Sequence, residues 1–98
     1  MTSVEEPAEA LIDERGLSRL KWRCRRGLLE NDIFIQRFFQ NFESTLTVRH
    51  SLGLSALMEL SDNDLLDLHL ARKSIVQVSA ELDREEVREV LCMLRKTH

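Results

Sequence analysis

Apolar residues recur at helical rather than strand spacing along most of this chain. The clearest run lies between residues 31 and 42, where most apolar positions repeat three or four residues apart. They are Ile33, Phe34, Ile35, Phe38, Phe39 and Phe42. This spacing is typical of one face of an α-helix, so we predict a helix over about residues 31–42. The width of its apolar stripe predicts that it is the most buried helix of the chain.

Capping residues predict further helices on both sides of this one. Ser18 is a good N-cap for a helix that runs to about residue 26, just before Gly27. Thr47 is the expected cap of a helix over about residues 48–60, although Gly53 inside it is less favourable than Ala by about 1 kcal/mol. Ser61 and Asp64 match a capping box at the start of the next helix.

The C-terminal third predicts one connector and one helix. Residues 74–82 alternate briefly like a strand, but a lone strand has no partner, so we expect an extended connector. Asp83 and Glu86 then open the last helix, whose apolar residues repeat at helical spacing. These are Val87, Val90, Leu91 and Leu94.

Five helices in 98 residues indicate one all-α domain, a compact five-helix bundle with short loops. The acidic residues 1–14, which contain the sole proline, predict a flexible tail, and residues 15–98 form the bundle. The composition is that of a soluble protein, without an apolar run of the roughly 20 residues that a membrane span needs. The first residues lack the basic start of a signal peptide, so we expect a cytoplasmic protein.

Charge is segregated along a chain whose net charge is −3. Residues 1–14 carry five acids and no base, whereas residues 15–26 carry six bases and no acid. This concentration of positive charge favours an anionic partner. Cys24 and Cys92 suggest two buried or partly buried free thiols, and the histidines show no ligand spacing, so we expect no metal site.

The basic segment has two faces when it is drawn as a helix. With Arg15 at zero and a step of 100° per residue, Arg19 falls at about 40°, Trp22 at about −20° and Arg26 at about 20°. The apolar residues Leu17, Leu20 and Cys24 fall on the opposite side. An outward Trp among arginines is typical of a binding surface. The alternative is that Trp22 folds back on a neighbouring helix under its arginines.

The stretch "RGLLE" follows at once and allows two interpretations. Arg26 and Glu30 are four residues apart, which is an ordinary salt-bridge spacing in a continuous helix. Gly27 instead indicates either a helix end or a spot where another backbone can approach closely. In the second case Arg26 and Glu30 flank a flat docking surface. No set of nucleophile, base and orienting residue and no Gly-rich phosphate loop occurs, so we do not predict an enzyme.

The segments "RLKWRCRRGLLENDIFIQRFF" and "LTVRHSLGLSALMELSDNDLLDLHL" resemble the small flavinylation factors that assist assembly of succinate dehydrogenase and fumarate reductase. The signature is Arg-Gly-x-x-Glu, formed here by Arg26, Gly27 and Glu30. Further matching positions are Arg19, Trp22 and Asp32.

The resemblance implies an all-α assembly chaperone that binds the flavoprotein subunit of succinate dehydrogenase, or of fumarate reductase, and promotes covalent linkage of FAD to a histidine of that subunit. It implies that FAD belongs to the client and that this chain holds no cofactor. The implied client-binding residues are Arg19, Trp22, Arg26, Gly27, Glu30 and Asp32. We expect a monomer that binds no nucleic acid and does not insert into a membrane.

The chain departs from the family pattern at Asn31, where bacterial relatives usually have Leu, and at Ser61 and residues 71–79. Two other functions stay open from the residues alone. The basic segment suits a small nucleic-acid-binding protein, although the acidic net charge and the lack of Asn or Gln in that segment speak against it. A regulatory module with an unrelated partner is the other alternative.

Overall fold

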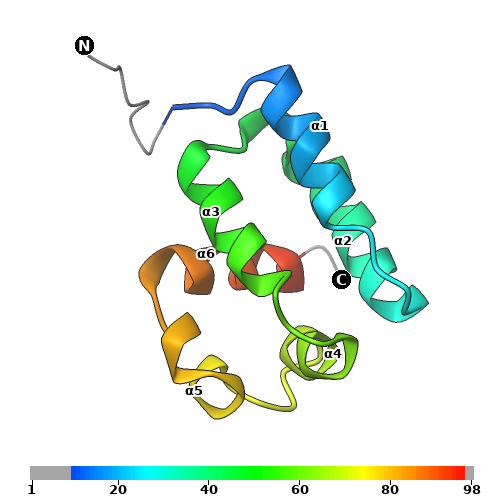
Figure 1. Ribbon diagram of the computed structural model, residues 1–98, viewed down its shortest axis with the longest axis vertical. Helices are drawn as coiled ribbons and strands as arrows, with labels where there is room; N and C mark the ends of the chain where they lie inside the picture. The colour runs from blue at the N-terminus through cyan, green and yellow to red at the C-terminus, as the bar shows by residue number, and fades with distance from the viewer. Residues whose placement is uncertain (1–9, 97–98) are drawn as a thin grey trace.

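The computed structural model describes residues 10–96, which form an all-α bundle (Figure 1). The helices are α1 (Glu14–Arg23), α2 (Leu29–Phe42), α3 (Val48–Leu57), α4 (Asp62–His69), α5 (Ile75–Val78) and α6 (Glu85–Lys96). Short 3₁₀ turns lie at Glu43–Thr45 and Ala80–Leu82. The predicted all-α bundle is confirmed; five of its helices were predicted, and the single turn of α5 is a sixth among the described residues. No helix in the described part of the chain is long and apolar enough to cross a membrane.

The core lies where α3 crosses α6 and where α2 packs on α4 and α6. Gly53 of α3 allows a close approach to α6, since a Cβ there would overlap the Glu86 carbonyl oxygen and lie 3.0 Å from a Val90 methyl. The fully buried side chains include Phe38, Leu46, Leu54, Leu57, Leu65, Leu68, Val87, Val90 and Leu94. Gly53 therefore favours this close contact between helices, although it weakens the helix locally.

Helix α2 is confirmed as an apolar, deeply packed element, with one exception in its stripe. Phe34, Ile35, Phe38 and Phe39 are buried. Ile33, which the pattern placed in the same stripe, is 39% exposed. Its position at the edge of the stripe turns it away from the core, so the prediction for this residue was wrong.

The predicted N-cap residues Thr47 of α3 and Ser61 of α4 are confirmed, although of these two caps only the one at Thr47 has both bonds of a capping box. Thr47 accepts a hydrogen bond from the His50 backbone, and the His50 ring accepts one from the Thr47 backbone in return. Ser61 accepts from the Asp64 backbone at 3.2 Å. These bonds satisfy backbone donors that the first turn of a helix leaves without partners.

Helix α1 begins and ends earlier than predicted. Its N-cap is Asp13, which accepts from the Gly16 backbone, and not Ser18. Just before it, the backbone of residues 10–12 pairs with that of residues 46–48, so this part of the predicted tail is tied to the bundle. The rest of the predicted tail, residues 1–9, lies outside the described residues, and the division into a tail and one domain stays a prediction.

The predicted connector at residues 74–82 was wrong, because this segment contains α5 and a 3₁₀ turn. Ser74 and Gln77 form a reciprocal capping box in which each side chain bonds the backbone of the other residue. Such a box stabilises a helical turn even in a short segment. Ile75 and Leu82 then anchor the segment in the core.

Candidate protein-interaction surface

Helix α1 presents two faces, as its sequence predicts. Leu20 and Cys24 are buried, at 5% and 0% exposure, whereas Trp22 is 71% exposed. Burial raises the pKa of the Cys24 thiol to about 12, so this sulfur stays protonated and unreactive. Cys92 is exposed, which corrects the expectation that both thiols are at least partly buried, and both cysteines are free.

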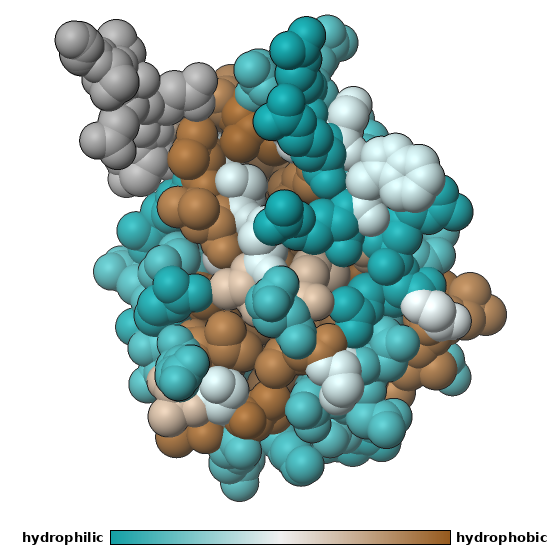
Figure 2. Space-filling view, viewed as in Figure 1, coloured by the Kyte–Doolittle hydropathy of each residue, from teal (hydrophilic) through white to brown (hydrophobic). Residues whose placement is uncertain are grey.

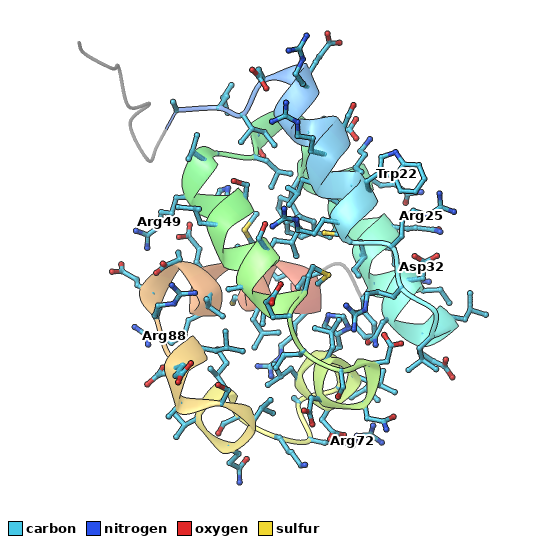
Figure 3. The ribbon with its side chains drawn as sticks, viewed as in Figure 1. Trp22, Arg25, Asp32, Arg49, Arg72 and Arg88 are labelled. Carbon is cyan, nitrogen blue, oxygen red and sulfur yellow. The ribbon has the colours of Figure 1, made fainter. Side chains whose placement is uncertain are left out.

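Trp22 lies on the outer side of the bundle, and the alternative that it folds back on a neighbouring helix was wrong. The guanidinium of Arg25 lies 5.0 Å from the centre of the indole ring, a cation–π arrangement. Trp22, Arg25 and Asp32 lie along the same edge of the molecule (Figure 3). Exposing a side chain of this size forgoes roughly 1.5–3 kcal/mol of burial energy, which favours a role in binding.

The exposed face of α1 is strongly basic. Arg19 is exposed on the same side as Trp22, and three further exposed arginines follow the same helix and its end: Arg15, Arg23 and Arg25. Hydrophilic side chains gather over α1 at the upper right of the molecule (Figure 2). A face with this charge attracts acidic surfaces of a partner.

A groove of about 630 Å³ separates α1 from α2. Its lining residues are Lys21, Trp22, Cys24, Arg25, Asp32, Ile35, Gln36, Phe39, Gln40 and Glu43. Lys21 forms an ion pair with Glu43 across it, and Asp32, which is half-buried, accepts a hydrogen bond from Gln36 at 2.9 Å. Asp32 thus borders the groove between α1 and α2 and does not lie beside Gly27.

Arg26 does not share the outward face of Trp22, so its predicted orientation was wrong. Its Nε donates to Asp62 Oδ1 at 2.9 Å, and its terminal nitrogens donate to the carbonyls of Met58 and Leu60 at 3.0 and 2.6 Å. Only 13% of the side chain is exposed. The helical angle failed here because α1 ends at Arg23, three residues before Arg26.

Residues 24–28, here called the junction, connect α1 to α2 and contain Gly27. Gly27 is exposed, does not adopt a positive φ, and a Cβ added to it would meet only Asp62 Oδ2, at 3.9 Å. The fold itself therefore does not require glycine here. The break also excludes the helical Arg26–Glu30 salt bridge, since Arg26 pairs with Asp62 instead.

Glu30 lies in the exposed first turn of α2, next to the junction. Leu28 caps this helix without a side-chain hydrogen bond, so an acidic residue in the first turn helps to stabilise its positive end. Leu29 is 66% exposed and, with Ile33 one turn later, forms an apolar spot beside Glu30. Ile33 was predicted to face the core, and no prediction was made for Leu29.

Asn31 and Asp62 also belong to this region and were not predicted. Asn31 is fully buried, and its Nδ2 donates to the Asp62 backbone carbonyl at 2.9 Å and to Asp62 Oδ1 at 3.2 Å. The bond from Arg26, followed by that from Asn31, holds the pKa of the Asp62 carboxyl below its usual range. A polar residue at a position where the resemblance implies Leu was the available signal.

Most of the predicted site residues lie at the surface. Arg19, Trp22, Gly27 and Glu30 form the exposed part of the predicted site, with Asp32 at its side and Arg26 beneath it. Among the described residues, no group of His, Cys, Asp and Glu could hold a metal ion. Contact of the six predicted residues with a client stays a prediction.

The family match and the similar proteins point to the same family. Residues 18–98 match the family described as flavinator of succinate dehydrogenase. The FAD assembly factor SdhE of Ralstonia nicotianae is 49% identical over 83 residues, which cover 85% of this chain and 84% of that protein. SdhE of Vibrio cholerae is 44% identical over 48 residues, 49% of this chain and 56% of that protein.

No solved structure matches the chain. The resemblance carried by the Arg-Gly-x-x-Glu signature is confirmed by these matches, which extend far beyond the signature. The chain belongs to the flavinator of succinate dehydrogenase family.

Proposed function

We propose that this protein is an assembly factor that binds the flavoprotein subunit of succinate dehydrogenase and promotes covalent attachment of FAD to it. The family and the names of the relatives support this role. The flavoprotein subunit of fumarate reductase is the second client that we propose. The protein acts in the cytoplasm as a monomeric chaperone, not as an enzyme, and FAD belongs to the client.

The observation that carries the proposal is the exposed glycine of the junction. Gly27 has an ordinary backbone conformation and open space where a side chain would be. Since the fold does not need glycine there, the missing side chain serves a contact outside the chain. The exposed Trp22 and Glu30 on either side of the junction supply an aromatic anchor and a carboxylate for the same contact.

The proposed mechanism is positioning. Arg19 and Trp22 on α1, Gly27 in the junction and Glu30 in the first turn of α2 bind the client. This binding favours the conformation in which the client's histidine and flavin lie in attack geometry. The bond forms between atoms of the client and its FAD. Nucleic-acid binding has less support, because the groove beside Trp22 is bordered by acidic residues, Asp32 and Glu43, that repel phosphate.

Deletion of the gene in the source organism tests the function. Flavin fluorescence of the denatured flavoprotein subunit on a gel measures covalent FAD. We expect a strong loss in the deletion strain and recovery with the wild-type protein but not with Gly27→Arg. Ala80→Arg is the matched control, because it adds the same side chain at an exposed position of the 3₁₀ turn after α5.

Covalent flavin at the wild-type level in the deletion strain would contradict the function. Recovery by Gly27→Arg would contradict the surface while leaving the function intact. Circular dichroism of the purified variants shows whether each has kept its helices.

A further inference from the structure

Asp62, the first residue of α4, holds both sides of the junction. Its carboxylate accepts from Arg26 at 2.9 Å and from the Asn31 amide at 3.2 Å, and the Leu28 backbone hydrogen-bonds to it as well. Its other oxygen is the atom nearest to a Cβ at Gly27. One carboxylate thus contacts the residues before and after the glycine.

Arg26 uses its donors within the chain. Besides Asp62, its guanidinium donates to the carbonyls of Met58, the C-cap of α3, and of Leu60, between α3 and α4. A guanidinium has five N–H donors in a fixed plane, and three are directed into the bundle. Little of Arg26 is therefore left to reach a partner.

The junction has few other ties. At its start the side chain of Cys24 is buried, and backbone bonds run from Cys24 to Leu20 and from Arg25 to Trp22. At its end the Asp32 backbone bonds Leu28, which gives α2 no side-chain cap. The bonds of Asp62 therefore decide how the exposed glycine and the first turn of α2 are presented.

We propose that Arg26, Asn31 and Asp62 form a junction anchor, a set of positioning residues that fixes Gly27 and Glu30 in the geometry that the client binds. In this assignment Arg26 acts through the anchor and does not contact the client. The contacts of the anchor are independent of the proposed function, and only the identity of the client rests on it. Charge-assisted hydrogen bonds to a carboxylate are strong and directional, which suits them to holding a loop in one conformation.

Asp62→Asn tests the anchor, with Asp64→Asn as the matched control. Both substitutions remove one acid from the first turn of α4 with almost no change in size. In Asp62→Asn, however, the side chain loses its charge and one of its two acceptor oxygens, which weakens the bonds that it accepts from Arg26, Asn31 and the Leu28 backbone. Losing a charged hydrogen bond of this kind weakens an interaction by about tenfold or more.

Hydrogen–deuterium exchange of the purified full-length protein measures the junction without any client. We expect the amides of residues 26–30 to exchange about tenfold faster in Asp62→Asn, as judged from the lost charged bond, while the α3 and α6 amides keep their rates. Asp64→Asn should leave the junction unchanged. Equal exchange at the junction in the two variants would overturn the anchor.

Affinity for the isolated flavoprotein subunit measures the consequence. Asp62→Asn should raise the dissociation constant by about tenfold, Asp64→Asn should not, and Gly27→Arg should abolish binding. Faster exchange in Asp62→Asn with unchanged affinity would overturn the positioning role. Binding by Gly27→Arg would contradict the proposed surface instead, so the two failures can be told apart.

Discussion

The buried imidazole of His69 predicts that the protein becomes less stable as the pH falls below 6.5. His69 is 3% exposed and stacks on Phe34 with ring centres 4.5 Å apart. Neither of its ring nitrogens has a hydrogen-bond partner among the described residues. Burial, and to a lesser extent the charges of Arg95 and Arg26, lowers its pKa from 6.5 to about 4.

The sign and size of the effect follow from proton linkage. Between pH 6.5 and 4 the unfolded chain carries the proton on this residue and the folded chain does not, so falling pH favours unfolding. A tenfold change in proton affinity is worth about 1.4 kcal/mol, and the lowered pKa of His69 therefore corresponds to about 3 kcal/mol. A domain of this size has about 5–15 kcal/mol of stability in total. The stability contribution is complete above pH 6.5 and is lost by about pH 4.

Urea unfolding followed by circular dichroism at several pH values between 7.5 and 4.5 measures this loss. His69→Phe is the comparison, because a phenyl ring can keep the contact with Phe34 but cannot take up a proton. The free energy of unfolding of the His69→Phe variant should depend much less on pH than that of the wild-type protein. Asp62 and Glu89, whose pKa values are lowered by their bonds to Arg26 and Arg49, are common to both proteins and act at lower pH. An equal pH dependence in both proteins would refute the reasoning.

Two substitutions and one labelling experiment test the packing. Gly53→Ala should lower the free energy of unfolding by about 1–3 kcal/mol, since the added methyl overlaps the Glu86 carbonyl; unchanged thermal stability would contradict the close approach. Ala71→Gly should raise it by about 1 kcal/mol, because Ala71 has a φ of 59° after α4; a lower melting temperature would argue against that backbone. An alkylating reagent with mass-spectrometric readout should modify Cys92 in the native protein and Cys24 only after denaturation, and equal rates would contradict the burial of Cys24.

The faces of α1 and α2 could be predicted because they depend on neighbouring residues in one helix. Leu20 and Cys24 are buried and Trp22 is exposed, as the step of about 100° per residue requires. The same rule failed for Arg26, because an angular rule ends where its helix ends. The break could be inferred from Gly27, but the new direction of the arginine could not.

The partners of Arg26 could not be predicted because they come from distant parts of the sequence. Asp62 lies 36 residues further along the chain, and the pattern around it indicated only the start of α4. Local signals predicted the N-caps of α3 and α4, but not that of α1, where Asp13 and not Ser18 is the cap. The capping box of Ser74 and Gln77 is visible in the sequence and would have predicted the turn of α5.

The spacing of the Arg-Gly-x-x-Glu motif has a physical explanation in this fold. Arg26 turns inward to Asp62 just after α1 has ended, so the next residue, Gly27, lies over that carboxylate and faces outward. Leu28 then caps α2, and Glu30 falls in its first turn, where an acidic side chain stabilises the helix while it remains exposed. Moving the glutamate by one residue would rotate it by about 100° around α2. The motif therefore specifies one bend of the backbone, with an inward anchor before the glycine and an outward carboxylate after it.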